Sequence, residues 1–373
     1  MKAVTRFTVA AAAAGVLAAA GTAAPALASA PRHAVFVQTD NLKGNQIVTY
    51  TRSSEGTLTQ AGVFPTGGLG GQLEGSAVDH TASQGALAYD SQSGLLYAVN
   101  AGSNTVSVFG VFGEKLALHQ VISSGGTFPV SIAVHDGLVY VLNALEGGSV
   151  QGFTVSEGHL TPIAGSNRPL GLEPNATPQF THSPGQVVFS PSGSQLIVTT
   201  KANGNDVDVF TVEAGGLLSG SPVVNPLPGT VPFAITFDRQ GHLILSESAG
   251  ALADFQLNAS GTIQQLDVVP SEQIATCWVV GARGHFYTSN PGSASLSSFK
   301  ESFGGQVLTL LGDTTTNGGT VDATVTPDER FLYVQTGAEG IVDEFSIGAQ
   351  GALSAVGSVT VPGAIGGEGI VAG

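Results

Sequence analysis

The sequence has few charged residues and a single cysteine. Aspartate, glutamate, lysine and arginine make up 10% of the 373 residues, against about a quarter in an average globular protein, which excludes a charged, disordered polymer. With Cys277 alone, the chain forms no internal disulfide and no thiolate zinc cluster. Only 12 residues are basic and 27 are acidic, which argues against binding to nucleic acid or to anionic lipids. The sequence therefore predicts a fold that is stabilised by packing and strand ladders.

The N-terminus has the three parts of a secretory signal peptide. Two basic residues precede an apolar, alanine-rich stretch, and "APALASAP" supplies small residues for cleavage. We predict a signal peptide over residues 1–28, with cleavage at the latest after Ala30, and a single secreted domain over residues 31–373. An uncleaved membrane anchor is the alternative. No later stretch reaches the ~18 apolar residues of a spanning helix, so we expect no membrane insertion once the signal is removed.

Glycine is abundant, with 52 residues, and it accompanies an internal repeat. Seven short apolar runs recur at a mean spacing of about 50 residues, which is the length of a propeller blade. Their centres are Phe36, Tyr97, Tyr140, Ile197, Ile244, Phe286 and Tyr333. Each run is followed at a nearly constant distance by an aromatic residue, namely Tyr50, Phe109, Phe153, Phe210, Phe255, Phe299 and Phe345.

Each repeat is expected to contain four strands. A further apolar strand follows the aromatic residue, as in "EGTLT", and another precedes the centre of six repeats, as in "GQVVFS". The first repeat lacks this preceding strand, and "GEGIVA" at residues 367–372 has the missing pattern. We therefore predict an all-β, seven-bladed β-propeller of four-stranded antiparallel blades, in which the C-terminal strand completes the N-terminal blade and closes the ring. An antiparallel sandwich is the alternative.

Two long connections, residues 64–84 and 161–183, are expected on the face of the ring that holds the mouth of the channel. Polar residues near this face are candidates for a site. The candidate catalytic acid/base residues are His182, Glu247 and Glu173. The candidate substrate-binding residues are Arg168, Lys201, Gln84, Gln186 and Asn290. The alternative is a hydrated channel whose polar walls only contact water.

Motifs of known chemistry are absent from the sequence. There is no G-x-S-x-G, H-E-x-x-H or EF-hand-like pattern, so we predict neither a metal nor a cofactor. Cys277, beside Trp278, is interpreted as buried packing, with a nucleophile as the alternative. Asp322 precedes an apolar strand and is expected to bond the neighbouring backbone.

Several segments resemble one known family. "SQGALAYDSQSGLLYAVNAGSNTVSVF", "GQVVFSPSGSQLIVTTKANGNDVDVF" and "ATCWVV" are similar to the seven-bladed lactonases, which include the cycloisomerase type of 6-phosphogluconolactonase and the 3-carboxymuconate cyclases. The likeness covers the whole mature chain and is strongest to secreted actinobacterial members. It implies opening or closing of the lactone ring of a sugar acid or a muconate by metal-independent acid/base chemistry, with arginines holding an anionic substrate.

The sequence departs from this family at two positions. Gly185 stands where the enzymatic members have a histidine, and Thr200 replaces an acidic residue. Two functions therefore remain open. The first is a secreted lactonase-like hydrolase that acts on a small anionic or sugar-derived lactone. The second is a non-catalytic propeller of the cell envelope or extracellular space that binds a protein or a glycan.

Overall fold

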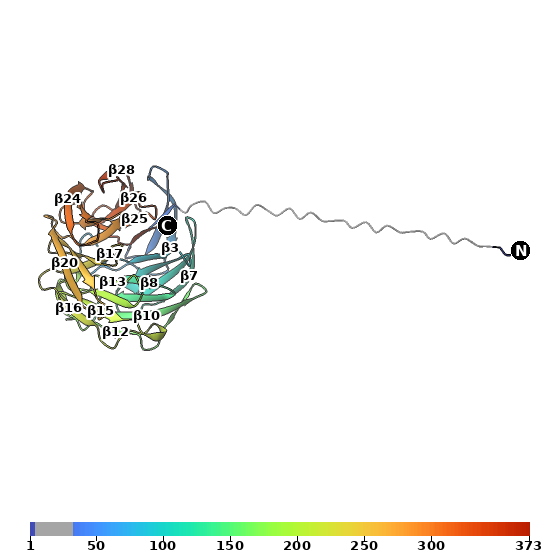
Figure 1. Cartoon of the computed structure of the whole chain (residues 1–373), viewed down its shortest axis with the longest axis horizontal. Coiled ribbons are helices and arrows are strands. Elements are labelled where there is room, and N and C mark those ends of the chain that lie inside the picture. Colours follow the sequence, from blue (N-terminus) through green and yellow to red (C-terminus); the bar gives the residue numbers. More distant parts are fainter. Residues whose placement is uncertain (4–32) are drawn as a thin grey trace. The chain divides into compact units, whose positions relative to one another are not determined.

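The computed structural model describes residues 1–3 and 33–373, and its compact unit is His33–Gly373. Residues 4–28 of the predicted signal peptide lie outside the described residues. The compact unit is a ring of seven antiparallel sheets (Figure 1), which confirms the predicted seven-bladed β-propeller. No helix in the part of the chain that the structure describes is long and apolar enough to cross a membrane.

The blades follow one another along the chain, and in blades 2 to 7 the first strand of the blade is innermost (Figure 1). Blade 1 consists of β29 (Ile370–Ala372), β1 (Ala34–Gln38), β2 (Gln46–Arg52) and β3 (Leu58–Pro65). Blade 2 consists of β4 (Leu87–Asp90), β5 (Leu95–Asn100), β6 (Thr105–Phe112) and β7 (Lys115–Ser123). Blade 3 consists of β8 (Pro129–His135), β9 (Leu138–Asn143), β10 (Ser149–Ser156) and β11 (His159–Pro162), with the short β12 (Arg168–Pro169) also beside β10.

Blades 4 to 7 repeat this arrangement. Blade 4 consists of β13 (Gln186–Phe189), β14 (Gln195–Thr199), β15 (Asp206–Thr211) and β16 (Val223–Pro226). Blade 5 consists of β17 (Pro232–Phe237), β18 (Leu243–Glu247), β19 (Ala251–Leu257) and β20 (Ile263–Pro270). Blade 6 consists of β21 (Trp278–Ala282), β22 (His285–Asn290), β23 (Ser295–Glu301) and β24 (Leu308–Thr315). Blade 7 consists of β25 (Thr320–Val325), β26 (Phe331–Thr336), β27 (Ile341–Ile347) and β28 (Leu353–Thr360). Four one-turn helices lie in the connections: η1 (Ala101–Ser103), α1 (Gln179–His182), α2 (Lys201–Gly204) and η2 (Ala214–Gly216).

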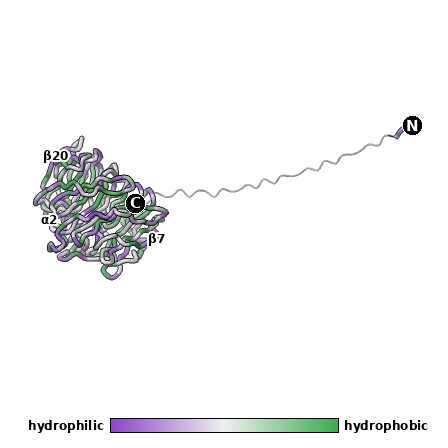
Figure 2. Tube along the Cα trace, turned by 90° about the horizontal axis from the view of Figure 1, so that it is seen from below, coloured by the Kyte–Doolittle hydropathy of each residue, from purple (hydrophilic) through white to green (hydrophobic). Residues whose placement is uncertain are grey.

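The recurring aromatic residue in the third strand of each blade packs between the blades. All seven are at most 2% exposed, and in five blades a β-bulge lies directly before the aromatic residue. A bulge increases the local twist of a strand. Seven hydrophobic clusters, one between each pair of neighbouring blades, form the core, so hydrophobic residues are spread around the whole ring (Figure 2).

Three tyrosines of second strands join neighbouring blades. The hydroxyl of each donates a hydrogen bond to a glycine carbonyl in the outer hairpin of the next blade. The pairs are Tyr140 with Gly216, Tyr287 with Gly351 (3.0 Å) and Tyr333 with Gly56 (2.7 Å). Burial raises the pKa of all three phenols, so these hydroxyls remain protonated donors.

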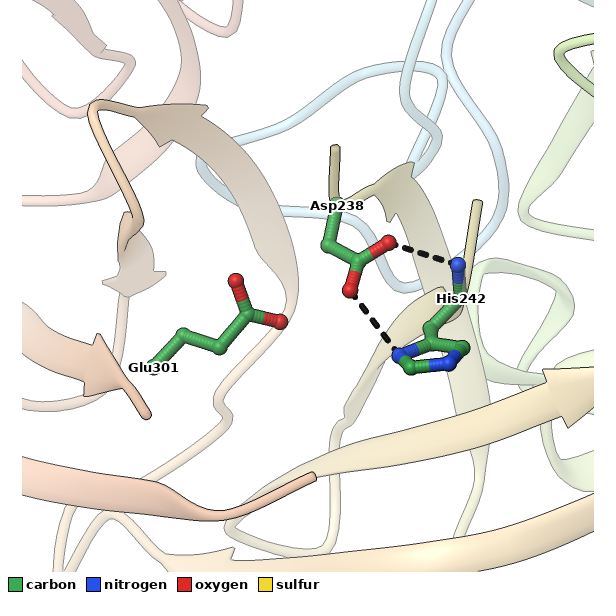
Figure 3. A group of neighbouring side chains, drawn as sticks. All are labelled: Asp238, His242 and Glu301. Carbon is green, nitrogen blue, oxygen red and sulfur yellow. Dashed lines mark hydrogen bonds and ion pairs between the residues drawn. The ribbon is translucent and has the colours of Figure 1, made fainter. Parts of the chain in front are cut away.

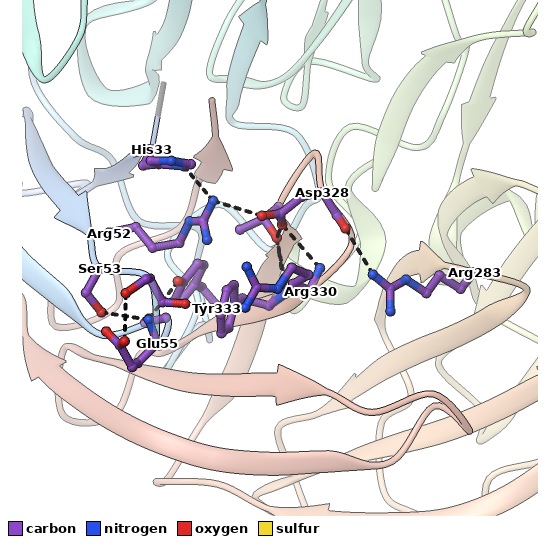
Figure 4. Close-up of polar contacts among 12 residues, drawn as sticks. His33, Arg52, Ser53, Glu55, Arg283, Asp328, Arg330 and Tyr333 are labelled. Carbon is purple, nitrogen blue, oxygen red and sulfur yellow. Dashed lines mark hydrogen bonds and ion pairs between the residues drawn. The ribbon is translucent and has the colours of Figure 1, made fainter. Parts of the chain in front are cut away.

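The ring closes between blades 7 and 1, as predicted. Strand β29 pairs antiparallel with β1, so the last strand of the chain supplies the inner strand of blade 1. On the same seam, the buried Arg52 guanidinium contacts Asp328 at 3.1 Å and His33 Nδ1 at 2.7 Å, and it lies 5.0 Å from the centre of the Phe331 ring (Figure 4). Backbone pairing and a partly buried ion pair therefore close the ring together.

Candidate functional site

The connection between β3 and β4 fills the middle of the ring on the face that carries the long connections. The Gln84 side chain of blade 2 pairs with the main chain of Val279 in blade 6, donating from Nε2 at 3.1 Å and accepting at Oε1 at 2.9 Å. These two blades lie on opposite sides of the ring. The connection therefore crosses the central axis.

Glu368, which lies just before β29, fixes this connection. Its carboxylate accepts hydrogen bonds from Trp278 Nε1 (2.8 Å), from the Ser83 amide (3.0 Å) and from the Thr81 hydroxyl. Burial raises the pKa of the Glu368 carboxyl well above its usual range. Gln186, a predicted substrate-binding residue, accepts a hydrogen bond at Oε1 from the Ile235 amide at 2.5 Å. Side chains that we expected to face an open channel are thus bonded to the protein itself.

A cavity of about 590 Å³ lies beside this crossing. Its walls come from the β3–β4 connection, α1, α2 and the axis-proximal ends of blades 5 and 6. Most of the lining is apolar and includes Val78, Ala82, Phe180, Val231, Phe233 and Ala275. The polar lining residues are Asp79, Thr181, Lys201, Ser248 and Cys277. An apolar cavity of this size with a few polar groups is typical of a small-molecule site.

Asp79 is the carboxylate of this cavity. Its side chain is buried, and Oδ1 accepts a hydrogen bond from Ser76 Oγ at 3.0 Å. Within the described part of the chain, Oδ2 makes no side-chain hydrogen bond. Burial raises the pKa of Asp79 to about 6, while the Lys201 ammonium acts in the opposite direction. At neutral pH the group is therefore mostly ionised and can accept a proton.

Lys201 supplies a buried positive charge next to Asp79. Its ammonium donates to the carbonyls of Ala82 and Phe180, both at 2.6 Å, and to Ser183 Oγ at 3.0 Å. Burial lowers the pKa of Lys201 to about 8, and Asp79 opposes this shift. These three hydrogen bonds use all three protons of the ammonium. Lys201 therefore holds the β3–β4 connection and the segment around α1 in place, and it acts on a molecule in the cavity through its charge.

Cys277 lines the cavity as a protonated thiol. It is buried, its Sγ lies 3.3 Å from Ser248 Oγ, and burial raises its pKa to about 12. A thiol without thiolate character is a poor nucleophile. We expect the native protein at pH 8 to leave a thiol-specific reagent unreacted, and the denatured protein to consume one equivalent. Rapid reaction of the native protein would contradict this assignment.

Of the predicted substrate-binding residues, the structure places Lys201 in the cavity and Gln84 and Gln186 near the axis. Arg168 lies at the side of blade 3, where its guanidinium donates to four main-chain carbonyls. Asn290 is fully buried and bonds Thr276 and Ser295 at a turn. Both side chains hold loops in place.

Of the predicted acid/base residues, His182 and Glu173 line one small pocket, where Asn203 donates to the carbonyls of both, whereas Glu247 lies elsewhere. His182 ends α1, and its Nδ1 lies 3.0 Å from the Pro178 carbonyl. Glu173 is exposed and accepts hydrogen bonds from Asn175. Glu247 is buried at the end of β18, and no described residue hydrogen-bonds its side chain. Burial raises the pKa of Glu247 to about 7. None of the three lines the cavity that contains Asp79.

Asp79 is the residue that sequence reasoning missed. It lies within residues 64–84, the connection expected to carry function, but it belongs to no motif. Its partner Lys201 lies far along the chain, and nothing local links the two. The available signal was a single acidic residue in the apolar stretch "SAVDHTA".

Comparisons with known proteins agree with this architecture. A family model described as "Lactonase, 7-bladed beta-propeller" matches residues 46–366, while no curated protein matches the sequence. Similar solved structures include a Lactobacillus plantarum protein, with 20% identity and a TM-score of 0.74 over 91% of this chain and 98% of that one. A proposed 6-phosphogluconolactonase of Bacteroides uniformis has 18% identity and a TM-score of 0.71 over 89% and 98%.

The periplasmic gluconolactonase of Pseudomonas aeruginosa is a further neighbour. It shares 17% identity with this chain, with a TM-score of 0.71 over 91% of this chain and 98% of the other. At such identities, the likeness to each of these structures shows the fold alone.

Proposed function

Because the chain belongs to the seven-bladed β-propeller lactonase family, we propose that it hydrolyses a small lactone in the cavity that contains Asp79. The observation that carries this proposal is the buried Asp79 carboxylate, whose Oδ2 is free of side-chain hydrogen bonds. It lines a cavity of about 590 Å³ together with the buried Lys201 ammonium. A general base with a pKa near the working pH, held beside a fixed positive charge, suits attack by water on an ester carbonyl.

Asp79 is the proposed general base. It accepts a proton from a water molecule as the water oxygen forms a bond to the lactone carbonyl carbon. The ring C–O bond then breaks, and the proton passes from Asp79 to the departing ring oxygen, so that the product is a hydroxy acid. The Lys201 charge favours the anionic tetrahedral intermediate, and the Ser248 hydroxyl in the cavity wall is available as a donor. This route needs no metal and no cofactor.

The cavity lining favours an uncharged substrate. Lys201 is the one basic residue among the lining residues, and its protons already bond the protein. A phosphate or a dicarboxylate is normally held by arginine or by several free donors. The apolar walls instead suit the ring face of a small lactone, such as that of an unphosphorylated sugar acid, more than a muconate-type anion.

We further propose that the enzyme acts outside the cytoplasm. The signal-peptide pattern of residues 1–28 supports export. The periplasmic location named for the P. aeruginosa gluconolactonase is in keeping with it. A lactone present outside the cell would then be the substrate.

Lactone hydrolysis by the purified protein tests the proposal. A panel of aldonolactones and aliphatic lactones is followed by pH-stat titration, with the spontaneous rate subtracted. We expect Asp79→Asn, which keeps the size of the side chain, to lower kcat by roughly 10²-fold or more, the usual contribution of a general base. Asp136→Asn, an exposed change in the β8–β9 hairpin, should leave kcat unchanged.

Two further variants separate this assignment from the sequence-based one. Loss of turnover in His182→Ala or Glu247→Gln, with Asp79→Asn fully active, would move the chemistry to the residues predicted from sequence. If the folded wild-type protein opens no lactone, the proposal is wrong. The protein would then be a propeller that binds an extracellular protein or a glycan.

A further inference from the structure

A second cluster of titratable residues lies on the opposite face of the ring, between blades 5 and 6. Asp238 and His242 belong to the hairpin between β17 and β18, and Glu301 ends β23 of the next blade (Figure 3). One donor atom from each of the three residues lies within 4.8 Å of the other two. The hairpin thus meets the neighbouring blade through a histidine and two carboxylates.

The donor atoms of this cluster are buried, and the close contact between Asp238 and His242 is an ion pair within the cluster itself (Figure 3). Asp238 Oδ2, His242 Nδ1 and Glu301 Oε1 all lack a hydrogen bond. Nevertheless, Asp238 Oδ2 and His242 Nδ1 lie only 2.9 Å apart. Two atoms that ligate one metal ion at about 2.1 Å each are separated by about 3.0 Å at a right angle and by about 3.4 Å in a tetrahedron. The observed spacing is close to that of adjacent ligands of a single ion.

Gly305 leaves space between the three donors. It lies in the hairpin that follows β23, with φ +68. A Cβ built on it would lie 2.5 Å from Asp238 Oδ2, 2.9 Å from His242 Nδ1 and 3.2 Å from Glu301 Oε1. One point therefore lies close to all three atoms, and a side chain at position 305 would occupy it.

Asp254 adds a buried carboxylate behind the histidine. It is fully buried, neither of its oxygens has a hydrogen-bond partner, and its Oδ1 lies 4.0 Å from His242 Nδ1. Within residues 33–373, no lysine or arginine forms an ion pair with Asp238, Asp254 or Glu301. Buried carboxylates without enough matching positive charge are costly. Among the described residues, His242 is the one group in ion-pair contact with these carboxylates, so a single imidazole faces three carboxyl groups.

Solvent reaches the cluster through a small cavity. A space of about 100 Å³ is lined by Asp238 and Glu301, together with Arg239, Arg283 and Glu329. Glu329 is held by the two arginines, at 3.4 Å from Arg239 and 3.7 Å from Arg283. An ion therefore has a route to Asp238 and Glu301.

We propose that Asp238, His242 and Glu301 bind one divalent transition-metal ion of the Zn²⁺ or Mn²⁺ class, which joins blade 5 to blade 6. An imidazole nitrogen combined with carboxylates suits these ions, whereas Ca²⁺ and Mg²⁺ prefer oxygen ligands alone. The ion neutralises the buried carboxylates and holds two blades together. Its role is structural, because it lies on the face opposite to the Asp79 cavity and takes no part in the proposed reaction.

Calorimetric titration of the chelator-treated protein with Zn²⁺, Mn²⁺ and Ca²⁺ tests this site. We expect one equivalent of Zn²⁺ or Mn²⁺ to bind, and Ca²⁺ to bind at least 100-fold more weakly. At a free ion concentration one hundred times Kd, Tm should rise by roughly 4 °C for a chain of this length. Neither readout depends on turnover of a lactone.

Variants of the cluster connect binding to these residues. Glu301→Gln and Gly305→Ala should each lower the affinity at least tenfold, the first by removing a ligand charge and the second by filling the space. The matched control is Glu329→Gln, in the wall of the same cavity, which should bind the ion as the wild type does. Two results would overturn the proposal: no stoichiometric binding to the folded wild-type protein, or equal affinity in Glu301→Gln and Glu329→Gln. Asp238 and Glu301 would then share a proton as a carboxylic acid–carboxylate pair.

Discussion

Deletion of residues 366–373 is expected to prevent the ring from folding. The deletion removes β29, which pairs with β1, and Ile370, which packs in the cluster between blades 7 and 1. It also removes Glu368, which binds Trp278 and the β3–β4 connection at the axis. Loss of a whole inner strand exposes a sheet edge and leaves the buried Trp278 indole without its carboxylate partner.

Far-UV circular dichroism and size-exclusion chromatography measure this effect. We expect the truncated protein to aggregate or to lack a cooperative thermal transition. Deletion of Gly373 alone is the control, because it removes only one backbone hydrogen bond to Ala34, and this variant should fold. A truncated monomer that melts cooperatively within a few degrees of the wild type would show that β29 does not close the ring.

Thermal stability is expected to be higher at pH 5 than at pH 8. Four buried carboxyl groups that line neither proposed site have strongly raised pKa values. Burial raises the pKa of each group to about 7. The four groups are Asp40, Asp208, Glu247 and Asp322. In the unfolded chain these groups titrate near 4. Between about pH 4 and pH 7 the folded state therefore holds more protons than the unfolded state.

The sign of the effect follows from proton linkage. When the folded state binds more protons, the free energy of unfolding falls as pH rises, so stability is lost from about pH 4 to about pH 7. Burial lowers the pKa of His80 and His285, which oppose the effect of the four carboxyl groups below about pH 6.5, and Lys201 opposes it only above its folded pKa of about 8. Each unit of pKa shift corresponds to about 1.4 kcal/mol. Even a small part of the combined shift gives a Tm difference of roughly 4 °C or more.

Melting curves at constant ionic strength check this expectation. Glu247→Gln is the informative variant, because no described residue hydrogen-bonds the Glu247 side chain and the change removes only the charge. It should raise Tm at pH 8 and change Tm little at pH 5. A wild-type Tm at pH 8 equal to or above that at pH 5 would contradict the assigned pKa shifts.

The sequence was sufficient to predict the architecture because the architecture repeats. An aromatic residue such as Phe109 or Phe299 recurs at the same place in every blade. Each recurrence strengthens the prediction of the same strand in the other blades. The strand pattern at residues 367–372 has no neighbouring strand in the sequence with which it could pair. Pairing with the first blade, which closes the ring, was the one arrangement that gave this strand a partner. Periodicity therefore identified the blades and their closure.

The sites do not repeat, and so the sequence offered no such redundancy. The Asp79–Lys201 pair combines a connection of blade 2 with a one-turn helix of blade 4, and Glu301 meets Asp238 from the next blade. Such pairs depend on how connections cross the axis and how hairpins pack. Residues such as Arg168 were selected by charge and position, and only the structure shows its guanidinium bonded to main-chain carbonyls.

The most direct test of the proposed chemistry is the pH dependence of kcat/KM for lactone opening in the wild type and in Asp79→Asn. If Asp79 is the general base, the wild-type rate should fall tenfold per pH unit below a pKa of about 6. The residual rate of Asp79→Asn should not change across this range. A wild-type profile that is flat through pH 6, or the same acid limb in Asp79→Asn, would contradict the account.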